Sequence, residues 1–182
     1  MIDDLDDAAE AMRDSIVASL PDRLDRASPC EGWTVRNVIN HVVTGNLRTV
    51  AWTQAENGPR NEEDHLGDNP LGAFDASYRQ VRTRLAELIV GGRPVQTPFA
   101  LLSIDRLIEM RSTELVVHAW DIARATDKST AFLPDLCERL LLHARSDIDG
   151  LDRTGSPFDA EQPPPSGASE ADRLAAFFGR TL

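Results

Sequence analysis

The chain has 182 residues, enough to form one domain with a sizeable buried core. Its formal net charge of −11 at pH 7 argues against a nucleic-acid-binding protein, which needs a basic face, and it disfavours attraction to an anionic membrane surface. No apolar run approaches the roughly 20 residues of a membrane span, and the acidic N-terminus lacks the features of a signal peptide. We therefore expect a single domain, residues 1–182, in the cytoplasm, with neither nucleic acid nor membrane as a partner.

The hydrophobic pattern predicts a helical protein. Apolar residues recur three and four positions apart, which is typical of amphipathic helices. The expected helices span residues 3–20, 35–56, 70–90, 104–126 and 134–151, followed by a short one that Ser169 caps and that ends near residue 178. β-branched residues are frequent in the second segment and also favour a strand, but its length and spacing favour a helix.

Two connecting segments lack a helical pattern. Residues 95–102 are expected to form a linker with a brief extended stretch, and residues 152–167, which include three consecutive prolines, are expected to be irregular. No strand, repeat or domain linker is indicated. The fold class that follows is all-α: a four-helix bundle with a short additional C-terminal helix.

The most informative stretch lies in the fourth predicted helix. Glu114 and His118 are four residues apart and Asp121 follows three later, so all three lie on one face of a helix, beside apolar positions that belong in a core. Burying these groups is costly unless something pairs with them, and a divalent metal ion would do so. The Glu-x-x-x-His pattern alone is common by chance, so the hypothesis requires a third ligand from elsewhere.

The candidate third ligand is His41, which lies near the apolar stripe of the second predicted helix. A lone histidine at such a position is more often a core residue satisfied by a hydrogen bond. Facing Glu114 and His118, however, it would complete a set of two imidazoles and one carboxylate, which suits zinc or a similar divalent ion. Three protein ligands leave a coordination position open, as in catalytic rather than structural sites.

Two motifs resemble those of a known family. The segment from Ser28 to His41 (SPCEGWTVRNVINH) and that from Glu114 to Ala125 (ELVVHAWDIARA) are similar to the N-terminal, DinB-like domain of mycothiol-dependent maleylpyruvate isomerase. The resemblance covers most of the chain, including the closing segment from Asp172 to Arg180. It implies a DinB-like four-helix bundle with a divalent metal held by His41, Glu114 and His118.

The resemblance also implies a class of function. The expected cofactors are a divalent metal, zinc or alternatively nickel, and mycothiol. The expected partners are a small-molecule thiol and an electrophilic substrate, as in a thiol-dependent transferase or isomerase, and a homodimer is a further assembly to test. The isomerase carries a second domain that has no counterpart here, so maleylpyruvate isomerisation itself is not expected. The alternative is a metal-binding or sensor bundle without turnover.

Other residues leave alternatives open. Asp121 is a fourth ligand, a partner that orients His118, or an ordinary helix charge. Cys30 precedes a helix, where a thiol can become reactive, but a buried and inert cysteine is the more frequent case. Arg111 is a candidate to bind a cofactor carboxylate, against the simpler expectation of a surface ion pair; the same applies to Arg48 and Arg124. His65, in an acidic loop, is expected to be solvated.

Overall fold

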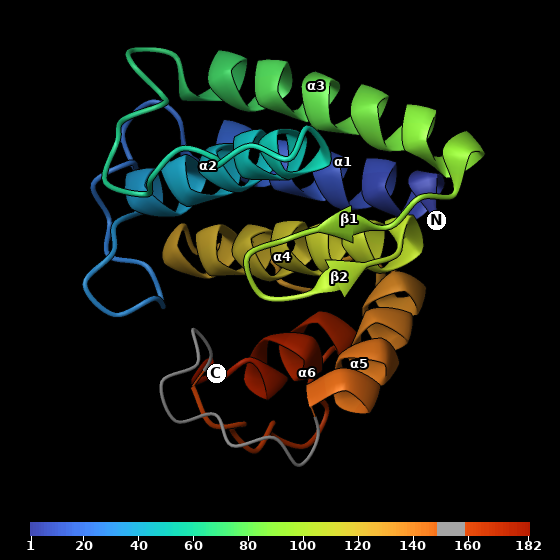
Figure 1. Cartoon of the computed structure of the whole chain (residues 1–182). Helices are drawn as coiled ribbons and strands as arrows, with labels where there is room; N and C mark the ends of the chain where they lie inside the picture. Colours follow the sequence, from blue (N-terminus) through green and yellow to red (C-terminus); the bar gives the residue numbers. More distant parts are fainter. Residues whose placement is uncertain (149–158) are drawn as a thin grey trace.

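The computed structural model describes residues 1–148 and 159–182, and its described part is mostly helical. The helices are α1 (Ile2–Ser19), α2 (Val35–Thr53), α3 (Pro70–Gly91), α4 (Ile104–Ala125), α5 (Pro134–Ile148) and α6 (Glu170–Phe177). The first four helices pack against one another as a bundle, in which α4 contacts α1 and α2, and α3 covers α1 and α2 (Figure 1). The predicted all-α bundle with an added C-terminal helix is therefore confirmed.

The helix starts follow from side-chain caps that the sequence contains. Thr34 caps α2 and exchanges hydrogen bonds with Asn37 in a capping box, and Ser103 caps α4. α2 ends at Thr53, three residues before the predicted end, and α4 ends at Ala125, within one residue of the prediction. Fraying at helix ends is the usual source of such differences.

The linker between α3 and α4 forms a small hairpin. Strand β1 (Val95–Gln96) pairs antiparallel with β2 (Leu101–Leu102), so the expected extended stretch is present as a two-stranded sheet. The predicted end of the fifth helix at residue 151, and residues 152–158 of the segment expected to be irregular, lie outside the described residues. Residues 159–167 contain neither helix nor strand, as expected.

The C-terminal helices are attached to the bundle through α4. α6 packs against α5 and α4, on the side of α4 away from α3 (Figure 1). Asp172, in the first turn of α6, accepts hydrogen bonds from the indole Nε1 of Trp120 (2.7 Å) and from Thr130 Oγ1 (2.8 Å). Trp120 is fully buried. A buried indole that finds its hydrogen-bond partner fixes the position of α6 on α4 and thus the course of the chain after it.

α4 is the central element of the core. More than half of its residues are buried, including polar and charged residues that normally lie at the surface. The buried polar and charged side chains on α4 are Arg111, Ser112, His118 and Asp121. Among the described residues, no helix is both long and apolar enough to cross a lipid bilayer.

Candidate metal centre

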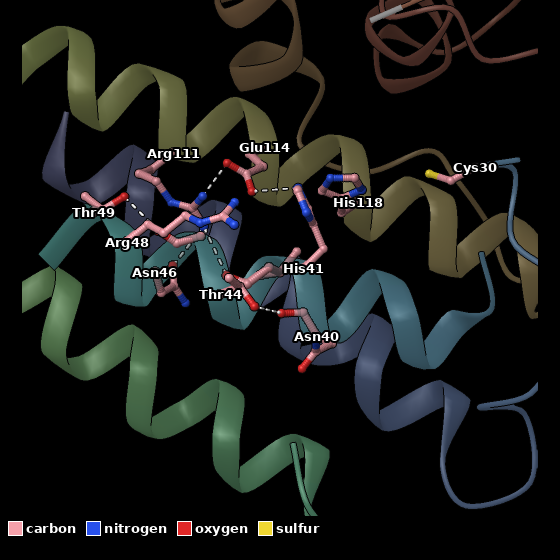
Figure 2. Close-up of polar contacts among 12 residues, drawn as sticks. Cys30, Asn40, His41, Thr44, Asn46, Arg48, Thr49, Arg111, Glu114 and His118 are labelled. Atoms are coloured by element: carbon pink, nitrogen blue, oxygen red, sulfur yellow. Dashed lines mark hydrogen bonds and ion pairs between the residues drawn. The ribbon is translucent and has the colours of Figure 1, made fainter. Parts of the chain in front are cut away.

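Two facing helices bring the three predicted ligands together. α4 supplies Glu114 and His118 from consecutive turns, and α2 supplies His41 (Figure 2). One ligand atom from each residue lies within 4.8 Å of the other two. His41 Nε2 is 3.2 Å from a carboxylate oxygen of Glu114, and the two imidazole centroids are 5.0 Å apart. The structure therefore places all three predicted residues in one cluster.

Asp121 orients the imidazole of His118. Its Oδ2 lies 2.9 Å from His118 Nδ1. Burial raises the pKa of Asp121, but hydrogen bonds from His118 and Arg180 outweigh it and lower that pKa to about 2, so the carboxyl is ionised at neutral pH. Burial also lowers the pKa of His118, more than Asp121 raises it. A neutral His118 that donates from Nδ1 keeps the lone pair of Nε2 available, as in carboxylate–histidine–metal arrangements.

Arg180 occupies the other side of Asp121. Its guanidinium donates to Asp121 Oδ1 (3.0 Å) and Oδ2 (2.9 Å), and it lies 3.2 Å from Cys30 Sγ. Cys30, His118 and Asp121 also come within 4.8 Å of one another, which by distance alone suits a metal. Because the guanidinium already contacts both the sulfur and the carboxylate, a second cation there would be repelled. Of the three alternatives for Asp121, orienting His118 is the one that the geometry supports.

The thiol of Cys30 is held in its protonated form. It donates to Asp121 Oδ2 at 3.3 Å. Burial and the neighbouring Asp121 charge raise its pKa to about 12, despite the opposing effect of Arg180. A thiol with that pKa is almost entirely protonated at neutral pH and is a poor nucleophile. The structure therefore favours the inert interpretation of Cys30.

Arg111 is paired with Glu114 in the interior. Its side chain is 1% exposed, and it contacts Glu114 Oε2 from one turn earlier on α4. The expectation of a surface ion pair is wrong for Arg111, because its position on α4 faces α2 rather than solvent. Burial would raise the pKa of Glu114, but the Arg111 guanidinium holds that pKa well below its ordinary range. Glu114 is therefore ionised and available as a ligand.

The donor set fits a divalent ion. It comprises two imidazoles and an ionised carboxylate, the combination found in zinc sites with an open position. Nε2 of His41 faces the Glu114 carboxylate, and the opposite ring nitrogen, Nδ1, is buried without a hydrogen-bond partner among the described residues. His41 also lines a hollow of about 380 Å³ together with Gly32, Trp33, Asn37, Asn40, Asn61 and Glu62. A ligand approaching the cluster has room on this side.

The remaining histidines lie outside the cluster. The side chain of His65 is only 18% exposed, so the expectation that it is solvated is wrong. The loop that carries His65 is held against α2 by Asn40, whose side-chain oxygen accepts from the His65 backbone N–H and whose side-chain nitrogen donates to the Glu63 carbonyl. His143 is 48% exposed and contacts Glu109. Arg124 is exposed, and Arg48 donates to the Pro59 carbonyl.

Three residues beside the cluster were not predicted from sequence. Arg180 contacts Asp121, Asn46 accepts from Arg111, and Gly45 lies against both Arg111 and Glu114. Helical spacing does place Gly45 four residues after His41, which was an available signal. Nothing in the local sequence connects Arg180 with Asp121, 59 residues earlier.

Known proteins are similar to most of this chain. Two proteins of Mycobacterium tuberculosis, from strains CDC 1551 and H37Rv, are each 33% identical to this chain over 162 residues, or 88% of this chain and 87% of the relative, and both are described only as uncharacterized. No solved structure matches significantly. The model of the mycothiol maleylpyruvate isomerase N-terminal domain matches residues 5–123, which include all three candidate ligands. The chain therefore belongs to the family of the mycothiol maleylpyruvate isomerase N-terminal domain, which is DinB-like.

Proposed function

We propose that the protein binds one divalent ion through His41, Glu114 and His118 and uses it to hold a low-molecular-weight thiol such as mycothiol. The observation that carries this proposal is the convergence of the three ligand atoms within 4.8 Å, from two helices that pack together. Zinc suits the donor set best and nickel is the alternative. The family description supplies the class of thiol.

The chain's own residues prepare the site for this role. Asp121 fixes the ring of His118, Arg111 fixes the carboxylate of Glu114, and the hollow beside His41 admits a small molecule. A bound divalent ion would favour the ionised form of a coordinated thiol, which is a strong nucleophile at neutral pH. The expected reaction is conjugation of that thiol to a small electrophile, or a thiol-dependent isomerisation.

Metal binding is tested by elemental analysis and calorimetry with zinc and with nickel. We expect close to one equivalent for the wild type, a loss of most bound metal for His118→Ala, and no loss for the matched surface control His143→Ala. At a hundredfold excess over the dissociation constant, the ion should stabilise the fold by about 2.7 kcal/mol. Less than about half an equivalent in the wild type, or full occupancy in His118→Ala, contradicts the proposal.

Thiol binding is tested separately with cobalt-substituted protein. Direct coordination of the mycothiol sulfur should produce a charge-transfer band, and mycothiol should bind the metal-loaded protein more tightly than the chelated protein. If no such band appears and calorimetry gives equal affinities, the metal site stands and the thiol role does not.

A second candidate function is metal binding without turnover, as in a sensor. One observation favours it: every carboxylate and thiol contacting the cluster is already engaged. Glu114 and Asp121 are paired with arginines, and the Cys30 thiol donates to Asp121. Among the described residues that contact the cluster, none is a free general base. A cobalt protein that stays silent toward thiols would favour this function over the enzyme.

A further inference from the structure

The charge around the ligand cluster is balanced before any ion binds. Glu114 has Arg111 as its partner, and Asp121 has Arg180. Both pairs are largely buried, with the Arg111 and Asp121 side chains at 1% and 0% exposed. The remaining carboxylate at the hollow, Glu62, is 77% exposed and lies 3.5 Å from Arg60, so water screens it.

Hydrogen bonds hold the Arg111 guanidinium against α2. Its Nη2 donates to Asn46 Oδ1 at 2.8 Å and lies 3.5 Å from the Val42 carbonyl of α2. Asn46 donates in turn to Ser77 Oγ (3.0 Å), and that hydroxyl donates to the Phe74 carbonyl (3.0 Å). This chain of buried hydrogen bonds crosses from α4 through α2 to α3, so moving the guanidinium would leave several buried polar groups unsatisfied.

The backbone of α2 leaves room for this arrangement at Gly45. A Cβ at this position would lie 2.7 Å from Glu114 Oε1 and still closer to Arg111 Nη1. Glycine in the interior of a helix lowers its stability, so its presence here has a local reason. The absence of a side chain lets the guanidinium and the carboxylate lie directly against the helix that carries His41 (Figure 2).

Two consequences follow for an ion at this cluster. Because Arg111 engages Oε2 of Glu114, the oxygen directed toward His41 is Oε1, so the carboxylate offers one oxygen rather than two. Arg111 also cancels the charge of Glu114, and an imidazole that coordinates a metal ion carries no charge. The proposed ligands therefore leave the positive charge of a divalent ion uncompensated. In a largely buried site that charge strongly favours an anion over a neutral donor at the open position.

We propose that Arg111 is the specificity-determining residue of this site: it positions Glu114 through one oxygen and makes the open coordination position selective for small anionic ligands. Thiolates, carboxylates and simple inorganic anions share the required chemistry, and neutral nitrogen donors do not. This inference rests on the proposed metal site and goes beyond it, because it assigns the ligand class to a residue that does not itself touch the ion.

The test measures anion preference in cobalt-loaded protein by its visible spectrum. The full chain is titrated with thiocyanate, an anion, and with imidazole, a neutral ligand. Asn46→Asp adds a negative charge against Arg111 without removing a group that contacts Glu114, and Arg111→Met removes the positive charge. Both should weaken thiocyanate binding about tenfold relative to imidazole. Arg111→Lys keeps the charge and should retain the wild-type ratio within about threefold.

The outcomes separate this inference from the metal site itself. If the wild type takes up cobalt but Asn46→Asp and Arg111→Met keep its thiocyanate-to-imidazole ratio, the role of Arg111 is overturned and the metal site stands. If Arg111→Met does not take up cobalt, the ratio in Asn46→Asp decides alone. If the wild type takes up no cobalt, the metal site fails and this inference fails with it.

Discussion

Glu114 and Asp121 lie on the same helix, and each is paired with an arginine, but the two arginines come from different places. Arg111 precedes Glu114 by three residues on α4, whereas Arg180 follows Asp121 by 59 residues and lies after α6. The first pair forms wherever α4 forms, because residues three apart share a helix face. The second pair exists only when the C-terminal segment packs onto the bundle.

The site therefore has two parts that depend on the fold in different ways. The Glu114 part is the pair of Glu114 with Arg111, and the Asp121 part is the pair of Asp121 with Arg180. The Glu114 part requires α2 to approach closely, which Gly45 permits. The Asp121 part requires α6 to dock through Asp172, which brings Arg180 to a carboxylate that is fully buried. Residue 180 also lies beyond the segment that the family model matches, so the match alone does not account for the Asp121 part.

The largest expected effect comes from breaking the distant pair. In protein freed of metal by a chelator, Arg180→Met should lower the free energy of unfolding by about 3 to 5 kcal/mol, because it removes the cationic partner of a buried carboxylate. Urea denaturation measures the loss. The matched control is Arg173→Met, which removes a half-exposed arginine paired with Glu170 one turn away, and it should cost less than about 0.5 kcal/mol. Equal losses in the two variants would mean that the Asp121 part does not depend on the tail.

Acidification should separate the two parts next. The pKa of Asp121 falls from 3.8 to about 2 on folding, so its contribution to stability is present above pH 4 and is lost as the pH falls through about 2. That loss should amount to about 2 kcal/mol in chelated protein. His118 adds to it, because burial lowers its pKa below 6.5 and protonation below that pH favours the unfolded chain. In Asp121→Asn the stability should change less between pH 4 and pH 2, and an unchanged profile would contradict the assignment.

An added methyl group at Gly45 should disturb only the Glu114 part. Gly45→Ala should destabilise the protein by about 1.5 kcal/mol through overpacking against Arg111 and Glu114, and it should weaken metal binding in calorimetry. The control is Gly91→Ala at the end of α3, where a Cβ would meet nothing within 4 Å and the change should be neutral or stabilising. If Gly45→Ala stabilises the protein as an ordinary helical Gly→Ala change does, the close approach has no energetic role.

The smallest effect is expected in the reactivity of the Cys30 thiol. This reactivity reports on Asp121, because the Asp121 charge helps to raise the pKa of the thiol. With both thiol pKa values raised to about 12, Cys30 and Cys137 should react with a thiol reagent at pH 8 at least about tenfold more slowly in the native protein than in urea. Absorbance of the released chromophore follows the reaction. A fast native phase of one equivalent that disappears in Cys30→Ala would show that the Cys30 thiol is activated.

The sequence by itself indicated the helices and the candidate ligand residues. The spacing of apolar positions and the caps at Thr34 and Ser103 depend on neighbours in the chain, so local pattern located α2 and α4 closely. Glu114 and His118 share a helix face for the same reason. His41 became the candidate third ligand because it lies near the apolar stripe of a second helix, and such stripes pack against one another. The helices and the shared face of Glu114 and His118 are short-range properties, which can be predicted from a single sequence, whereas the position of His41 beside them depends on how α2 packs on α4.

Only the tertiary structure decided which charges are paired inside the protein. Arg111 has the spacing of an ordinary exposed helix pair, and what buries it is the approach of α2 at Gly45 and the hydrogen bond to Asn46. Arg180 reaches Asp121 because Asp172 docks α6 against Trp120, and no spacing rule relates residues 59 positions apart. Burial and long-range pairing depend on how all the helices pack at once, which the pattern of any one segment does not contain.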